Sequence, residues 1–248
     1  MSPHLNSDME KKTWEKRDTY NPHITIVTSL FDGHWTGVPH SVGIYDESWV
    51  DKLYRGIERN YNGTFGFICL TEKTRRFKEP IRQVRFSRSV DQYGWMSLME
   101  QYRPDLCIGN RCTMGLDTII TGPLNDIFEY SPEKVALCTD PYHPHLVCNA
   151  ITLATPEFAE EIWNIWLNDE QKILKECTLF GAPSEMVLLR KLYGNSPRID
   201  DMFPGRIVSY RVDVASMNIA VEDTSIIYFH GTTKPHQVNK EWMRRHWV

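Results

Sequence analysis

Short apolar runs rich in β-branched residues alternate with segments of helical spacing along most of this chain. The first run, 23–29, is typical of a buried strand. Ser48 and Asp51 resemble a capping box, and apolar residues then recur at helical spacing as far as Asn60. The run 64–70 has the pattern of a second strand. We therefore predict a β-α-β unit with a parallel pair of strands, because such crossovers are right-handed.

The same alternation continues downstream. A helix is predicted over 156–177, where apolar side chains fall on one face. Further strands are expected at 106–108, 117–120, 134–138, 150–153 and 225–229. No internal repeat is present. The pattern therefore predicts an α/β fold of the Rossmann-like kind, with a mostly parallel sheet and helices on both faces.

Length and composition favour a single domain. The 248 residues lie near the upper limit of one hydrophobic core, and an apolar share of 41% is enough to build it. The polar, aperiodic segment 1–22 is expected to be an N-terminal arm. The predicted domain spans 23–236, and 237–248 forms a basic and aromatic C-terminal tail.

The distribution of charged and apolar residues bears on the cellular location of the protein. No apolar run approaches the roughly 20 residues of a membrane span. The charged stretch 10–17 lacks the apolar core of a secretion signal, so we expect a cytoplasmic protein. The six cysteines show no C-x-x-C spacing and are expected to be buried free thiols. The net charge of −4 gives no general attraction to nucleic acid, although the local patch 240–247 could touch phosphate or be a solvated tail.

Polar residues that follow strands are the first candidates for chemistry, because ligands of open α/β sheets bind beyond the carboxyl ends of the strands. Asp117 lies in an apolar context, where an unpaired carboxylate would be costly, so it should have a cation or a donor as partner. By itself it could be a structural acceptor or a metal ligand. The same rule selects Thr28, Asp32, Asp140 and the stretch after Phe229.

The order of several segments adds a family resemblance. The chain resembles the nucleotide-diphospho-sugar glycosyltransferases of the GT-A fold, especially small bacterial and phage-type enzymes akin to the glycogenin-like family. The resemblance extends over nearly all of 22–247 and depends on the order of its motifs. It is carried by the first strand and then by 49–54, 67–72, 94–95, 115–122, 203–210 and 229–236.

The resemblance implies a cofactor and a leaving group. In such families a D-x-D turn after a strand holds Mn²⁺ or Mg²⁺, which bridges the two phosphates of the donor. A motif H-x-x-G-x-x-K-P near the C-terminus supplies a further ligand and a lysine for the diphosphate. Metal and lysine together neutralise the charge of the departing nucleoside diphosphate.

Three positions depart from the family pattern. Gly115 replaces the first acid of D-x-D, and Tyr228 replaces the histidine of the C-terminal motif. His230 lies two residues later, on the same side of an extended strand, and could replace that lost ligand. Where relatives show a G-D-Q-like segment at 181–186, Glu185 is the only acid.

These residues lead to a functional prediction. We expect transfer of a sugar from a nucleotide donor, UDP-linked by resemblance, to a hydroxyl of a glycan, lipid, protein or hydroxymethylated base of phage DNA. Asp117 and Glu185 are the catalytic candidates, and Asp117 with His230 would hold the metal. A catalytically weakened nucleotide-sugar or glycan-binding module is the alternative. The residues expected to bind the nucleotide sugar are Thr28, Ser29, Arg111, Asp117, Asn149 and Lys234.

Overall fold

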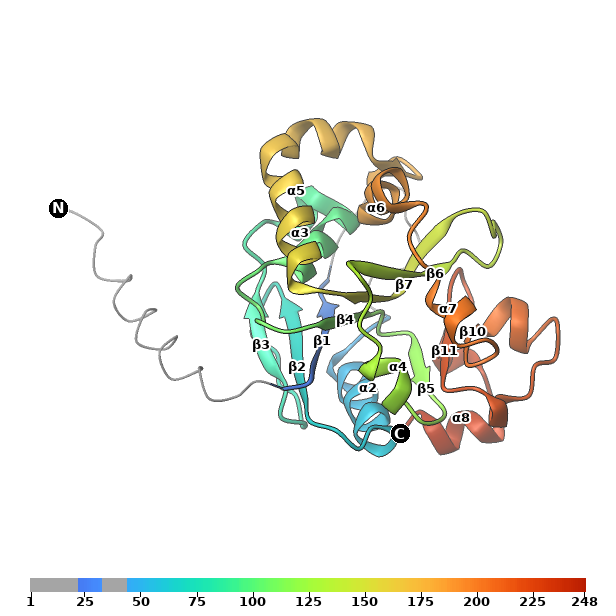
Figure 1. Cartoon of the computed structure of the whole chain (residues 1–248). Coiled ribbons are helices and arrows are strands. Elements are labelled where there is room, and N and C mark those ends of the chain that lie inside the picture. The colour runs from blue at the N-terminus through green and yellow to red at the C-terminus, as the bar shows by residue number, and fades with distance from the viewer. Residues whose placement is uncertain (1–21, 33–43) are drawn as a thin grey trace.

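A six-stranded sheet forms the centre of the computed structural model, which describes residues 22–32 and 44–248 (Figure 1). The strand order is β3-β2-β1-β4-β7-β6. The first four run parallel, whereas β7 is antiparallel to both of its neighbours. This sheet confirms the predicted mostly parallel α/β fold. Its strands are β1 (Ile24–Leu30), β2 (Phe65–Thr71), β3 (Arg82–Arg85), β4 (Arg111–Met114), β6 (Val135–Thr139) and β7 (Val147–Ala154).

A second, smaller sheet lies beside the first. After β4 the chain leaves the central sheet, and β5 (Thr118–Ile120) pairs antiparallel with β11 (Ile226–Tyr228). Strand β10 (Ile207–Ser209) runs parallel to β11 on its other side. A hairpin of β8 (Thr178–Leu179) and β9 (Ala182–Pro183) forms separately.

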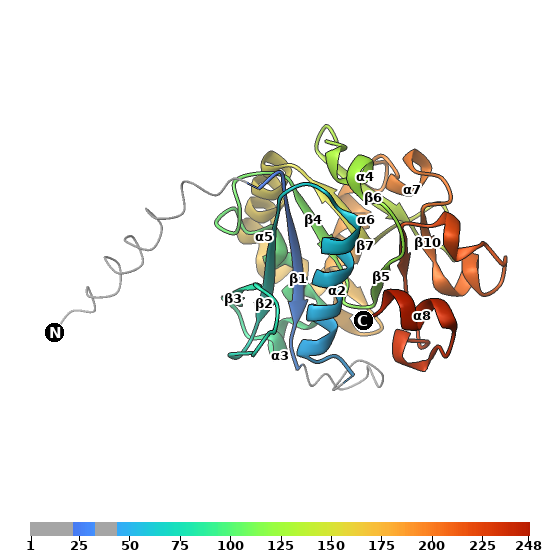
Figure 2. The same cartoon turned by 90° about the horizontal axis from the view of Figure 1, so that it is seen from below.

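Helices cover both faces of the central sheet, as predicted. Helix α2 (Glu47–Asn60) lies along β1 on one face, as Figure 2 shows, and α5 (Pro156–Glu176) and α6 (Glu185–Tyr193) lie on the other. The shorter elements are α3 (Val90–Tyr93), η1 (Gly94–Tyr102), α4 (Asn125–Glu129), α7 (Ile199–Met202), η2 (Tyr210–Val214), η3 (Val221–Asp223), η4 (Pro235–Gln237) and α8 (Glu241–His246).

The alternation of side chains along β1 explains why both faces are covered. Ile24 and Ile26 belong to the core cluster under α2, while Val27 packs on the opposite face with Leu106. Successive side chains of a strand point to opposite faces, so a strand with apolar residues on both faces is covered on both. The run 23–29 thus becomes a central strand.

Two local predictions are wrong. The segment 106–108 forms turns instead of a strand, because Leu106 inserts as a single buried side chain beneath β1 and β2. Helix α2 is capped by Asp46, whose side chain accepts a hydrogen bond from the Ser48 backbone N–H. Asp51 instead accepts hydrogen bonds from the backbone of the loop after β2, at Lys78 and Glu79.

The C-terminal tail packs onto α2. The rings of Trp247 and Trp49 lie 4.8 Å apart, and the ammonium of Lys52 lies 3.6 Å from the Trp247 ring centroid. Arg55 and Arg59 donate hydrogen bonds to the carbonyls of residues 248 and 246. Figure 2 shows the chain ending beside α2. The last residues therefore belong to the folded unit.

The cysteines, the absence of a long apolar helix from the described chain and the N-terminal segment can each be compared with the sequence predictions. All six cysteines are free thiols and five are buried. Among the described residues, no helix has the length and apolar character needed to cross a bilayer. The predicted N-terminal arm, 1–22, lies outside the described residues except for Pro22.

Candidate functional site

The two sheets bring distant segments together at one point. Strand β4 ends at Met114, and the turn 115–117 leads into β5. Strand β11 ends at Tyr228, opposite Thr118. The backbone N–H of Phe229 donates to the Asp117 carbonyl at 2.9 Å. The chain after β11 is thereby fixed beside Asp117.

Asp117 has the cationic partner that its apolar surroundings predict. The Lys234 ammonium lies 2.5 Å from Asp117 Oδ2, and the Tyr45 hydroxyl donates to the same oxygen at 3.0 Å. The carboxylate and the ammonium side chains are only 17% and 13% exposed. Burial, together with the neighbouring Asp117 charge, raises the pKa of Tyr45, so the phenol stays protonated and donates. We call Tyr45, Asp117 and Lys234 the Lys234 site.

An arginine lies beside the Lys234 site. Arg211 is exposed in η2, a single turn of π-helix of the kind often found at functional sites. A Cβ built on Gly231 would lie 3.3 Å from Arg211 Nη1, and Gly231 has a φ of +72°. A side chain there would be strained and would crowd the guanidinium. Within the described chain, Arg211 forms no salt bridge, and it lies over the Tyr142 ring at 5.7 Å.

His230 is held by neighbours other than Asp117. Its Nε2 forms a 2.6 Å hydrogen bond with the Ser209 hydroxyl, and its ring meets the edge of Tyr142 at 4.7 Å. Burial lowers the pKa of His230, so the ring is neutral near pH 7. Metal ligation by His230 stays a prediction.

The residues present do not fit a divalent metal ion. In the described part of the chain, no three His, Cys, Asp or Glu side chains gather into a possible metal site. Asp117 Oδ2 is already bonded to an ammonium and a phenol. Tyr228 is buried, and its burial raises the pKa of the phenol, which is then a poor ligand. The described residues therefore give no support to the Mn²⁺ or Mg²⁺ that the resemblance implies, and the presence of such an ion is not tested by the structure.

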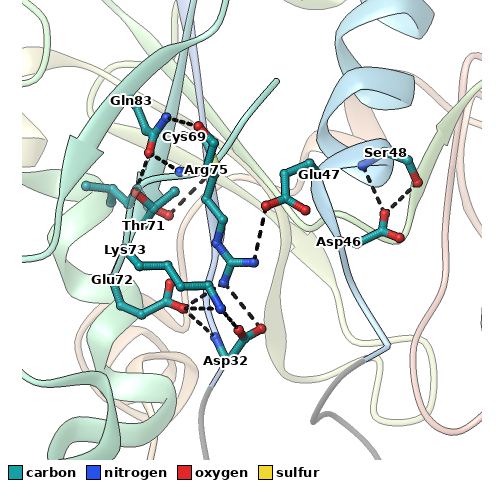
Figure 3. Close-up of polar contacts among 11 residues, drawn as sticks. Asp32, Asp46, Glu47, Ser48, Cys69, Thr71, Glu72, Lys73, Arg75 and Gln83 are labelled. Atoms are coloured by element: carbon teal, nitrogen blue, oxygen red, sulfur yellow. Dashed lines mark hydrogen bonds and ion pairs between the residues drawn. The ribbon is translucent and has the colours of Figure 1, made fainter. Parts of the chain in front are cut away.

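A second charged cluster lies at the carboxyl ends of β1 and β2 (Figure 3). The Arg75 side chain is 4% exposed, and its guanidinium lies 2.7 Å from Glu72, 3.2 Å from Asp32 and 3.7 Å from Glu47. Lys73 also pairs with Asp32. A hydrogen bond from Lys73 is the main reason that the pKa of Asp32 is lowered. We call these five residues the Arg75 network.

The start of α2 connects the two clusters. Tyr45 bonds to Asp117, and Glu47, two residues later, pairs with Arg75. The cap residue Asp46 lies between them, and Figure 3 shows it beside Glu47. Because two residues span at most about 7 Å, the Arg75 network and the Lys234 site flank one short stretch of backbone.

Glu185 and Asn149 form a buried pair on the α6 side. The Tyr102 hydroxyl donates to Glu185 Oε1 at 3.3 Å, and the Asn149 amide donates to Oε2. Glu185 is 1% exposed. Burial raises its pKa to about 8, which leaves the carboxyl protonated at neutral pH. Glu185 is therefore placed to hold Asn149.

Three predicted nucleotide ligands are bonded within the fold: Thr28 and Arg111 are buried, and Ser29 is half-buried. The Thr28 hydroxyl donates to the Met114 carbonyl at 2.8 Å, and Ser29 accepts from Gln101 at 2.9 Å. Arg111 is fully buried and donates to the carbonyls of Gln101 and Arg103 at 3.0 Å. In this arrangement Thr28 and Arg111 hold the sheet and η1 together, so we leave them out of the proposed site.

Sequence reasoning missed several residues of the two charged clusters, and it also missed Arg211. Glu72 follows β2 as Asp32 follows β1, and this spacing could have indicated the Arg75 network, but not Arg75 itself. Tyr45 precedes a helix and carries no motif. Arg211 lies far from every candidate in sequence, so only the second sheet reveals it.

Comparisons with known proteins identify the fold. No family model and no curated protein sequence matches the chain. Among solved structures, the glycosyltransferase GlyE of Streptococcus pneumoniae TIGR4 is 14% identical, with a TM-score of 0.60 over 88% of this chain and 56% of its own. An active-site mutant of LgtC is 13% identical, with a TM-score of 0.59 over 89% of this chain and 93% of its own. The bifunctional glycosyltransferase WbbM is 11% identical, with a TM-score of 0.58 over 89% of this chain and 48% of its own.

At 11–14% sequence identity, these matches show a shared fold and nothing about substrates. This chain spans about half the length of GlyE and of WbbM, at 56% and 48%. The resemblance to the phage-type and glycogenin-like enzymes stays a prediction. With its mixed central sheet and the smaller sheet beside it, the chain has the GT-A fold of nucleotide-sugar glycosyltransferases.

Proposed function

We propose that this protein is a glycosyltransferase, which takes a sugar from a nucleoside-diphosphate donor and transfers it to a hydroxyl acceptor. The observation that carries the proposal is the Lys234 site, at the junction of the two sheets of a GT-A fold. LgtC, with the same fold, is a galactosyltransferase whose structure holds donor and acceptor sugar analogues. A UDP-linked donor is the choice that the sequence resemblance favours.

The chemistry of the leaving group supports this role. Glycosyl transfer breaks the bond between the anomeric carbon and a diphosphate oxygen, so negative charge grows on the diphosphate. A fixed cation at that point stabilises the transition state more than the ground state. Lys234 is such a cation, and Asp117 and Tyr45 fix its position.

Asn149 is the proposed contact for the sugar. The Gly115 backbone N–H donates to the Ala150 carbonyl at 3.4 Å, which puts Asn149 beside the turn that carries Asp117. Its amide can bond a sugar hydroxyl, and Glu185 orients it. Because Glu185 is protonated at neutral pH, it adds no negative charge near a diphosphate.

A donor panel tests the function. The full chain is incubated with UDP-, GDP-, dTDP- and ADP-sugars, with and without Mn²⁺, and release of the nucleoside diphosphate is measured. We expect slow hydrolysis of one donor class and its loss in Asn149→Ala, with a loss of stability no larger than the roughly 1 kcal/mol of one hydrogen bond, that to Glu185. If no donor raises the melting temperature and none is hydrolysed, the proposal is wrong.

A binding module is the second candidate. The observation that favours it is Gly115, where the family pattern has an acid. A module would bind one nucleotide sugar tightly, yet give neither hydrolysis nor transfer to glycan, lipid, protein or DNA acceptors under any metal. Mass spectrometry of the acceptors after incubation with the bound donor separates the two candidates.

A further inference from the structure

Two cationic side chains lie close to the Gly231 turn, and only one of them is in a salt bridge with a described residue. Lys234 is paired with Asp117, while Arg211 forms no salt bridge with any described residue. A diphosphate brings at least two negative charges. We propose that the protein binds the diphosphate of its donor without a divalent metal ion, using Lys234 and Arg211 as the compensating cations. This inference rests on the proposed function, because it concerns the same donor.

The first argument is the loss of ligands for a metal. Hard cations such as Mg²⁺ and Mn²⁺ need several oxygen or imidazole ligands. Gly115 offers no side chain, Tyr228 is a buried phenol, and His230 is bonded to Ser209. A lone carboxylate that already holds an ammonium is a weak anchor for such an ion.

The second argument is the placement of Arg211. The π-helical turn η2 exposes its guanidinium, and the absent side chain at Gly231 leaves room for it. A guanidinium can donate two parallel hydrogen bonds to a phosphate, and it stays charged at any physiological pH. Its ring contact is with Tyr142, and within residues 22–32 and 44–248 its guanidinium donates to no carboxylate, which leaves it able to meet an anion.

The third argument concerns Asp117. In a metal site, Asp117 would be an essential ligand. In a site built from cations, Asp117 only positions the Lys234 ammonium and adds a negative charge that opposes the diphosphate. A metal site therefore predicts that Asp117→Asn loses Mn²⁺-dependent binding, whereas a site built from cations predicts that the variant keeps or gains affinity in the absence of metal.

Titration calorimetry of the full chain provides the test. UDP, GDP and inorganic diphosphate are titrated in excess EDTA, and again with Mn²⁺. We expect at least one nucleoside diphosphate to bind in EDTA, with an affinity that Mn²⁺ changes less than threefold. Binding that requires Mn²⁺ overturns the inference but leaves the proposed function standing. Absence of nucleotide binding in both conditions overturns both.

Variants assign the cations. In EDTA, Arg211→Ala and Lys234→Ala should each weaken binding at least about tenfold, since each removes charge-assisted hydrogen bonds to phosphate. Lys134→Ala, which takes a lysine from Glu161, and Lys172→Ala are matched controls with the same change in charge, and both should bind as the wild type does. An unchanged affinity in Arg211→Ala contradicts the proposal.

Asp117→Asn keeps the test decisive if Lys234→Ala fails to fold. The amide keeps the shape of the carboxylate and can still accept a hydrogen bond from Lys234. We expect binding in EDTA to be as tight as in the wild type or tighter. A tenfold loss in a variant with a normal melting curve would overturn the inference.

Discussion

The Arg75 network and the Lys234 site flank the same end of α2, yet they balance charge in opposite ways. Around Arg75, the three carboxylates Asp32, Glu47 and Glu72 face two cations. Beside Asp117, Lys234 has a single carboxylate partner, and Arg211, next to the Gly231 turn, has no salt bridge with a described residue. The first region therefore offers acceptors, suited to hydroxyl and base N–H groups, and the second offers donors, suited to phosphate.

Burial separates the two regions as well. Arg75 is enclosed by its partners, whereas Arg211 is exposed. A buried cation that holds three carboxylates contributes to folding, because removing it leaves charges without compensation. An exposed cation without a partner costs little to remove and is available to a ligand. Burial and pairing, and not charge alone, therefore distinguish a cation that stabilises the fold from one that is available to a ligand.

The largest expected effect comes from Arg75→Met. We expect a loss of about 3–5 kcal/mol in the free energy of unfolding, because Asp32 and Glu72 lose their buried cation and keep only the exposed Lys73. Lys234→Met should cost less, about 1–2 kcal/mol, because a single partly exposed pair is broken. Urea unfolding of both variants measures the difference. Equal losses of unfolding free energy in the two variants would show that Arg75 and Lys234 contribute equally to stability, contrary to this comparison.

Gly115→Asp should convert the Lys234 site into a metal site. A Cβ at Gly115 would lie 2.9 Å from Asp117 Oδ1, so the new carboxylate must displace that flexible group and then share a cation with it. At 100 times the dissociation constant, Mn²⁺ should stabilise this variant by about 2.7 kcal/mol. Melting curves with Mn²⁺ measure the shift, with Gly115→Asn as the uncharged control. A wild-type protein stabilised equally by Mn²⁺ would show that a metal site already exists.

Glu185 differs from both clusters, because its buried carboxyl is bonded to Tyr102 and Asn149 and to no described cation. Its pKa of about 8 in the folded state lies above the ordinary value, so the folded protein binds more protons than the unfolded chain between the two. Stability should therefore fall as pH rises through this window, by roughly 2 kcal/mol between about pH 6 and pH 8. Glu185→Gln should remove this slope. The control variant Glu161→Gln should keep the wild-type dependence of unfolding free energy on pH. If wild type and Glu185→Gln show the same pH dependence, Glu185 is ionised in the folded protein.

The smallest effect is expected for His230→Ala. Loss of the hydrogen bond to Ser209 should cost about 1 kcal/mol in unfolding free energy. Because burial lowers the pKa of His230, the folded state binds fewer protons than the unfolded chain, and the wild type should lose stability as pH falls below about 6.5. The variant should lack this decline. The Mn²⁺ dependence of donor binding should not change, and a higher Mn²⁺ requirement in the variant would instead support ligation.

Four of the six strands of the central sheet were predicted from the sequence, because β1, β2, β6 and β7 carry apolar runs. The run 23–29 is an example, and the helix over 156–177 was predicted from its apolar face. Strand β3, with the sequence Arg-Gln-Val-Arg, and the short strand β4 were not predicted, because neither carries a long apolar run. The segment 106–108 was mistaken for a strand because one buried leucine gives the same local pattern as a strand. Nucleotide binding by Arg111 stays a prediction, and periodicity does not reveal that this guanidinium donates to three backbone carbonyls inside the fold.

By itself, the sequence determined the α/β class, the positions of most strands and the need of Asp117 for a cationic or donor partner. These follow from local periodicity and from the cost of an unpaired carboxylate in apolar surroundings. Only the tertiary structure decided that the partner is Lys234, 117 residues away, and that Arg211 lies next to the Gly231 turn. Such choices depend on which strands pair, here β5 with β11. Pairing between strands so far apart is set by the packing of the whole domain, which no local pattern encodes.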